Sequence, residues 1–139
     1  MSLTVAFLGL GAIGAPMARH LAAGPFGLRV WNRTASRASA FAAEHGAVHA
    51  KTPADAARGA DVVVTRFPVS RDVEALLDGP DGLLAGFKKG AVLLDCTSGD
   101  PATSQRIAAR LAGAGVAFLD APVSGGVKAA VAGTLTVMV

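Results

Sequence analysis

Three glycines near the start of the chain have the spacing of a phosphate-binding turn. They are Gly9, Gly11 and Gly14, and the apolar run 5–8 precedes them. In such a turn the first glycine permits the tight change of direction, the second lets the backbone approach a pyrophosphate, and the third brings the following helix close to the strand. Unpaired amides at the start of that helix face the anion. The sequence therefore predicts a dinucleotide-binding turn made of Gly9, Leu10, Gly11, Ala12, Ile13 and Gly14.

The end of the second predicted strand indicates which dinucleotide this turn holds. Sites that prefer NAD carry an acidic residue there, about 20 residues after the turn, which accepts a hydrogen bond from the ribose 2′-hydroxyl. This sequence has Asn32, Arg33 and Thr34 instead. Because the guanidinium of Arg33 pairs well with a 2′-phosphate and stacks on adenine, we expect NADP rather than NAD. The alternative is that Asn32 or Thr34 caps the next helix while Arg33 is solvated.

Short apolar runs alternate with helical patterns along the whole chain. This alternation predicts an α/β fold with a doubly wound, mostly parallel sheet. The expected strands are residues 3–9, 27–31, a short one around 48, then 61–65, 91–95, 116–119 and 134–139. The expected helices are residues 14–23, 34–45, 52–59, 70–77 and 101–111, with caps at Thr52, Ser70 and Asp100. A glycine-bearing loop is expected between the last two strands.

Composition excludes several classes of protein. The net charge is +3, and the Lys and Arg residues are scattered instead of forming a basic stripe, so we expect no nucleic-acid partner. The apolar runs are too short to span a bilayer. The single cysteine, Cys96, is expected to be a half-buried structural thiol, and with no signal peptide in view we expect a cytoplasmic protein. The three histidines lack further ligands nearby, so we expect no metal site.

Three segments of the chain carry a resemblance to a known family. Residues 9–18 read GLGAIGAPMA, residues 120–126 read DAPVSGG, and residues 133–135 read GTL. These segments resemble the opening, substrate and GTL motifs of the β-hydroxyacid dehydrogenases, which include 3-hydroxyisobutyrate dehydrogenase and, more distantly, 6-phosphogluconate dehydrogenase. The resemblance implies a Rossmann-type NAD(P)-binding domain over residues 1–139, incomplete at its C-terminal end and truncated before an all-helical second domain. It implies hydride transfer between NADP and a small 3-hydroxy acid or the matching semialdehyde.

The resemblance also assigns site residues. Ser124, Gly125 and Gly126 would bind the carboxylate of a small substrate, for which a hydroxyl and backbone amides are suitable donors; the alternative is a plain turn. The loop ending in Phe67 and Pro68 would lie against the cofactor. Ser98, with Thr97 beside it, would contact the nicotinamide half. Arg66 departs from the family pattern and either reaches a phosphate or points to solvent.

The family's general base is a lysine on a helix that follows the first domain, beyond residue 139. Lys128 is read as a solvated loop residue and not as that base. We therefore expect this piece alone to bind cofactor without turnover, and we expect the full-length protein to be a homo-oligomer. Two alternatives stay open: an imine reductase-like enzyme with another residue in place of the lysine, and a non-catalytic dinucleotide-binding module.

Overall fold

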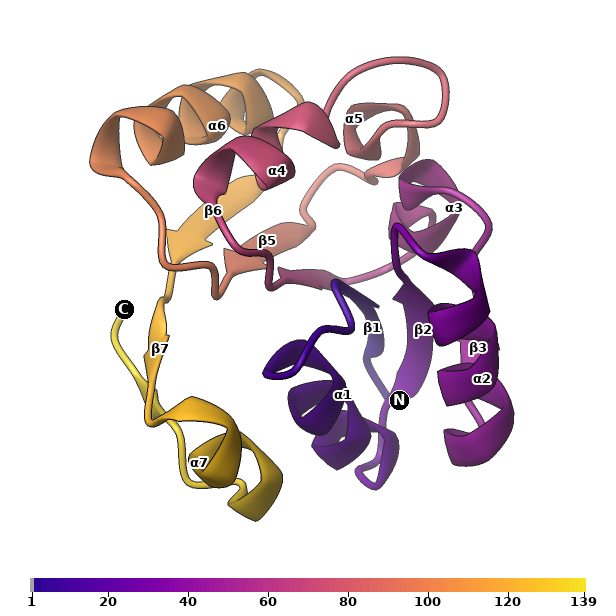
Figure 1. The fold of residues 1–139 in the computed structure, drawn as a ribbon. Helices are drawn as coiled ribbons and strands as arrows, with labels where there is room; N and C mark the ends of the chain where they lie inside the picture. The colour runs from indigo at the N-terminus through magenta and orange to yellow at the C-terminus, as the bar shows by residue number, and fades with distance from the viewer. Residues whose placement is uncertain (1) are drawn as a thin grey trace.

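The computed structural model describes residues 2–139. Six of its strands form one parallel sheet (Figure 1). The strand order is β3-β2-β1-β4-β5-β6. The order reverses between β1 and β4, and open sheets of this kind bind ligands at the carboxyl ends of the strands beside such a switch point. The predicted Rossmann-type fold class is thereby confirmed. The strands are β1 (Thr4–Leu8), β2 (Gly27–Trp31), β3 (Val48–His49), β4 (Val62–Thr65), β5 (Val92–Asp95) and β6 (Ala117–Asp120).

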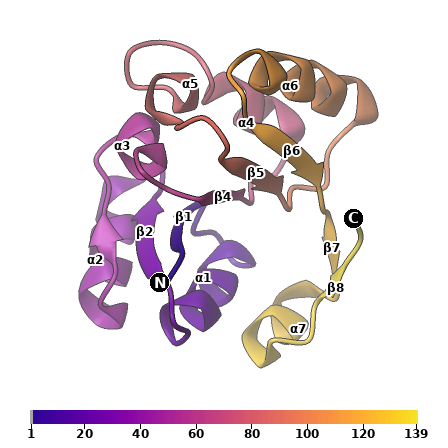
Figure 2. The same ribbon diagram turned by 180° about the vertical axis from the view of Figure 1, so that it is seen from behind.

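Helices cover both faces of the sheet, because each strand presents alternate side chains to opposite faces. In β1, Ala6 and Leu8 enter one core and Val5 and Phe7 enter the other, all buried. The first core lies under α3 (Pro53–Ala57), α4 (Ser70–Ala75), α5 (Leu83–Gly86) and α6 (Pro101–Gly113). The second lies under α1 (Gly14–Ala22) and α2 (Ala35–His45), and the view from behind shows the same two layers (Figure 2).

Two of the three predicted helix caps are confirmed. The Thr52 side chain accepts a hydrogen bond from the amide of Asp55, and Asp100 accepts one from the amide of Thr103, each at 3.0 Å. The prediction for Ser70 is wrong, because Ser70 is already the first residue of α4. Its hydroxyl instead accepts a hydrogen bond from the Asp100 amide at 2.9 Å, which ties the start of α4 to the start of α6.

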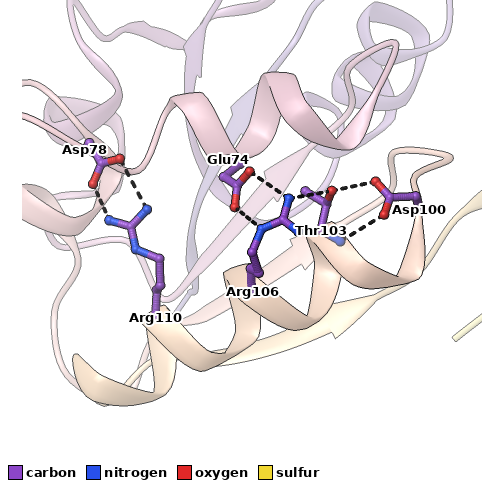
Figure 3. A network of polar contacts seen from close by, with 6 residues as sticks. All are labelled: Glu74, Asp78, Asp100, Thr103, Arg106 and Arg110. Carbon is purple, nitrogen blue, oxygen red and sulfur yellow. Dashed lines mark hydrogen bonds and ion pairs between the residues drawn. The ribbon is translucent and has the colours of Figure 1, made fainter.

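A row of ion pairs joins α4 and its following turn to α6 (Figure 3). Arg106 binds Glu74 through two nitrogens, at 3.0 and 3.2 Å, and donates a further hydrogen bond to the Thr103 hydroxyl. One turn further along α6, Arg110 binds Asp78. These hydrogen bonds lower the pKa of Glu74 and of Asp78. The stability that they contribute is present above the pKa that these carboxyls have in the unfolded chain, and it is lost as the pH falls through their lowered pKa.

The segment after β6 differs from the prediction. Instead of a loop followed by a long strand, it holds β7 (Val123–Ser124), α7 (Gly126–Ala132) and β8 (Thr136–Val137). The strands β7 and β8 pair antiparallel in a separate two-stranded sheet, so β8 does not extend the main sheet. Both figures show α7 on the same side of the sheet as α1. The short helix α5 also lies where the sequence predicted none.

The helix α7 escaped prediction because glycine marks both of its ends. Gly125 precedes it, and Gly133 ends it with a φ of 74°, a conformation typical of helix C-termini. The seven residues between them are too few for a helical period to stand out from a glycine-rich loop. Lys128 therefore lies exposed on a helix and not in a loop. None of the helices within residues 2–139 combines the length and apolar character that crossing a membrane requires.

Candidate functional site

The glycine turn sits at the carboxyl end of β1, at the switch point of the sheet. Gly9 has a φ of 102°, and a Cβ atom there would lie 2.1 Å from the carbonyl oxygen of Arg66. A Cβ atom on Gly14 would lie 1.8 Å from the carbonyl oxygen of Gly9, whereas one on Gly11 would have no atom within 4 Å. Gly9 and Gly14 are therefore required by the packing of the turn. Gly11 faces open space, which is the space that a phosphate group needs.

Asn32, just after β2, holds this turn in place. Its Oδ1 accepts a hydrogen bond from the Leu10 amide at 2.8 Å, and its Nδ2 donates one to the Thr34 carbonyl at 3.2 Å. Thr34 occupies the N-cap position of α2, but its side chain makes no capping hydrogen bond. Neither Asn32 nor Thr34 therefore acts only as a helix cap, because Asn32 links the end of β2 to the glycine turn.

Three arginines surround a pocket of about 240 Å³ beside the turn. Arg33 is 71% exposed at its side chain and lies 3.4 Å from the carboxylate of Asp72. Arg37 donates a hydrogen bond to the Leu10 carbonyl at 3.4 Å, and Arg66 also lines the pocket. The sequence reading missed Arg37. Its signal was available, because Arg37 is three residues beyond the helix cap and so shares the end of α2 that faces the turn. The other lining residues are Gly9, Gly11, Asn32, Thr34, Phe67 and Pro68.

A chain of buried hydrogen bonds supports the loop that ends in Phe67 and Pro68. The Phe67 amide donates to the Thr97 hydroxyl at 3.0 Å, and the Thr97 amide donates to Asp95 Oδ1 at 3.0 Å. Thr65 donates its hydroxyl to the same Asp95 oxygen at 2.9 Å. Thr97 is fully buried, so its hydroxyl positions the loop and does not face the pocket. Its neighbour Ser98 is exposed.

The Asp95 carboxyl lies inside the domain, under the loop that it supports. Its side chain is 1% exposed, and burial, with a smaller contribution from the nearby Asp120 carboxylate, raises its pKa. Its Oδ2 is buried without a hydrogen-bond partner within residues 2–139. The next residue, Cys96, is buried rather than half-buried as predicted, and burial raises the pKa of its thiol to about 11. Cys96 is therefore a neutral packing residue at neutral pH.

The substrate motif begins at the last residue of β6, at the same edge of the sheet as the glycine turn. Ser124 lies in β7, while Gly125 and Gly126 have φ values of 132° and 71°, and all three residues are exposed. The helix that follows them is fastened to α1. The Nε2 atom of His20 lies 3.1 Å from the Ala130 carbonyl oxygen, and Arg19 donates to the Val131 carbonyl at 2.9 Å.

A second pocket of about 440 Å³ lies between α1, the sheet and α7. Its lining is mainly aliphatic and aromatic, and His20 is its one side chain able to become a cation. Such a lining offers a phosphate little, so this pocket does not suit a dinucleotide. Within residues 2–139, no three side chains of His, Cys, Asp or Glu lie together as metal ligands would.

The fold and the turn together define a class of protein. A doubly wound parallel sheet with a glycine turn at its switch point, and with cations beside that turn, is a dinucleotide-binding domain. Residues 4–139 match the family described as the NAD binding domain of 6-phosphogluconate dehydrogenase, and the chain belongs to that family.

Characterised relatives carry the same domain. The NAD-dependent L-serine dehydrogenase of Pseudomonas aeruginosa is 44% identical over 97% of this chain and 45% of its own length. The 3-hydroxyisobutyrate dehydrogenase of Mycobacterium tuberculosis, solved with L-serine, is 36% identical with a TM-score of 0.90, over 99% of this chain and 46% of that one. Psf3, solved with NADP+ and 2-OPP, is 32% identical with a TM-score of 0.87, over 96% and 47%. This chain spans about half the length of the curated relatives that it matches.

A likeness to imine reductases extends to the fold alone. The imine reductase from Pseudomonas sp. has a TM-score of 0.79 but is 24% identical, over 93% of this chain and 44% of that one.

Proposed function

We propose that this chain is the NADP-binding domain of an oxidoreductase that transfers a hydride between NADP and a small 3-hydroxy acid or the matching semialdehyde. One observation carries the choice of nucleotide: Arg33 and Arg37 line the pocket at the end of β2, where NAD-preferring sites place an acidic residue. The open space at Gly11 suits the pyrophosphate, and the arginines suit a 2′-phosphate. When bound, NADP supplies or accepts the hydride.

The nucleotide has to be argued from this chain's own residues, because the relatives differ. One is named as NAD-dependent and another was solved with NADP+. In this chain the Arg33 guanidinium already forms an ion pair with the Asp72 carboxylate. Because this ion pair is exposed and therefore weak, a 2′-phosphate can replace Asp72 as the partner of Arg33. Arg37 holds only a long hydrogen bond to a backbone carbonyl. Both guanidinium groups are thus available to a doubly charged phosphate.

Calorimetric titration of NADP and NAD tests this preference. We expect NADP to bind at least about tenfold more tightly than NAD, because a charge-assisted hydrogen bond contributes about 1.5–3 kcal/mol. Arg33→Asp should weaken NADP binding by about tenfold or more and leave NAD binding within about threefold. Lys89→Asp is the matched control, because Lys89 is exposed and lies before the amino end of β5, at the end of the strands away from the glycine turn. Tighter binding of NAD than of NADP by the wild type would contradict the proposal.

We propose that Ser124, Gly125 and Gly126 bind the carboxylate of the substrate. Support comes from the match to the family's substrate motif, from the exposure of all three residues, and from their place at the cofactor edge of the sheet. Lys128, exposed on α7, is given no part in proton transfer. The intact motif favours an enzyme over a non-catalytic module, and the imine reductases share with this chain only the fold.

Kinetics of the full-length protein test the substrate site. Ser124→Ala should raise KM for the hydroxy acid by about tenfold, the loss expected for one hydrogen bond to a charged group, and should leave the Kd for NADP unchanged. Ser39→Ala is a suitable control, because Ser39 is an exposed hydroxyl residue on α2 and lies outside the motifs described above. An unchanged KM in the Ser124 variant would show that this hydroxyl does not contact the substrate.

A further inference from the structure

Arg66 is fixed at the junction between β4 and the glycine turn. Its amide donates a hydrogen bond to the Leu8 carbonyl at 3.0 Å, and its carbonyl oxygen occupies the space that a Cβ atom on Gly9 would need. The backbone of Arg66 therefore rests directly on the turn. Any side chain at this position starts within reach of whatever the turn binds.

The Arg66 side chain lines two pockets beside the glycine turn, and its hydrogen bonding within the protein is incomplete. It is half-buried, and its Nη1 donates to the Phe67 carbonyl at 2.6 Å. Its Nε is buried and has no hydrogen-bond partner within residues 2–139. A buried donor left without a partner costs about 1–3 kcal/mol, and more when the group is charged. Since Nε itself is buried, an anionic oxygen would bind the part of this half-buried guanidinium that lines the pockets.

The pockets that Arg66 lines indicate which anion. Arg66 forms one wall of a pocket of about 300 Å³ whose other wall is the glycine turn, residues 11–14. It also borders the neighbouring pocket that contains Arg33 and Arg37. The amides of the turn face the pyrophosphate in this fold, whereas the two other arginines stand where the adenosine ribose is bound. Arg66 thus lies on the pyrophosphate side of the site.

We infer that the Arg66 guanidinium binds the pyrophosphate of the dinucleotide, adding a side-chain cation to a turn that otherwise offers backbone amides. This inference rests on the proposed function for the presence of a dinucleotide, but not for the choice between NADP and NAD. Arg66 contributes to affinity for both nucleotides, because both contain the same pyrophosphate. Arg33 and Arg37 select between them. The two tasks are thereby divided between the loop after β4 and the start of α2.

Four probes separate these tasks by calorimetry: NADP, NAD, ADP and adenosine 2′-monophosphate. ADP carries the diphosphate without a 2′-phosphate, and adenosine 2′-monophosphate carries the reverse. Arg66→Met should weaken NADP, NAD and ADP by about tenfold each and leave adenosine 2′-monophosphate within about twofold. Arg66→Lys should recover part of the loss, and the binding of NAD to Arg66→Met should depend less on salt. Arg58→Met is the control, because Arg58 is exposed and lies before the amino end of β4, at the end of the strands away from the glycine turn.

Two results would overturn the inference: unchanged affinity of Arg66→Met for NADP, NAD and ADP, or a loss confined to NADP and adenosine 2′-monophosphate. Circular dichroism checks that Arg66→Met is folded, and Arg66→Gln, which keeps a polar but uncharged end on a shorter side chain, replaces it if it is not. A wild type that prefers NAD while Arg66→Met weakens NAD and ADP would overturn the NADP proposal and support this inference.

Discussion

Gly14→Ala is expected to destabilise the domain by about 3 kcal/mol or more, because a Cβ atom there meets the Gly9 carbonyl oxygen at 1.8 Å. The obstacle is backbone, so relief requires α1 to move away from β1 or the turn to change its shape. Urea denaturation, with the free energy of unfolding extrapolated to water, measures the effect. A Gly14→Ala variant as stable as the wild type would show that the helix can shift at little cost.

Gly11→Ala is the matched comparison and should separate binding from folding. A Cβ atom at Gly11 meets nothing within 4 Å, so the free energy of unfolding should stay within about 1 kcal/mol of the wild-type value. The new methyl group would enter the space reserved for the pyrophosphate, and NADP binding should weaken by about tenfold or more. Normal binding by this folded variant would mean that the pyrophosphate does not approach Gly11.

Asp95→Ala is expected to cost about 2–4 kcal/mol of stability. The change leaves the Thr65 hydroxyl and the Thr97 amide without their shared acceptor, and it opens a small cavity under the loop that carries Phe67. Dinucleotide binding should weaken with it, since the Phe67 amide is held through Thr97. Asp95→Asn keeps an acceptor oxygen in the same place and should lose clearly less. Equal losses in the two variants would show that the acceptor does not matter.

The raised pKa of Asp95 predicts a particular pH dependence. A carboxyl whose pKa is higher in the folded than in the unfolded chain binds its proton more tightly when folded. Its contribution to stability is therefore greatest below the unfolded pKa and declines as the pH rises through the folded pKa. Asp95→Asn removes this decline, so its stability relative to the wild type should improve from acid to neutral pH. Thermal unfolding at several pH values measures the trend, and a constant difference would contradict it.

Short-range signals made much of this fold predictable. The glycine turn, the caps at Thr52 and Asp100 and the apolar strand that precedes the turn depend on neighbours in sequence, and the structure bears them out. The family motifs added the segment that we propose as the substrate site.

Other features depended on contacts that no local pattern encodes. Ser98 is the predicted contact and Thr97 the neighbouring candidate, but no sequence pattern shows that the Phe67 amide, 30 residues away in sequence, donates to the Thr97 hydroxyl. The sequence predicts a helix cap at Ser70, but the Ser70 hydroxyl accepts its hydrogen bond from the Asp100 amide at the start of α6. These hydrogen bonds depend on the packing of elements that are far apart in sequence, and local sequence patterns do not encode that packing.

The central place of β1 determines how the site is prepared for its ligand. β1 is paired on both sides, with Leu8 opposite Trp31 of β2 and opposite Thr65 of β4, and the Gly9 amide continues the ladder to the Trp31 carbonyl. Fraying of this strand end would break pairings with two neighbours at once. The turn amides consequently hold their directions before a nucleotide arrives, and little conformational entropy remains to be lost on association. The anion site is thus ordered when the sheet forms. The affinity for a nucleotide therefore depends on the contacts made with it more than on a rearrangement of the turn.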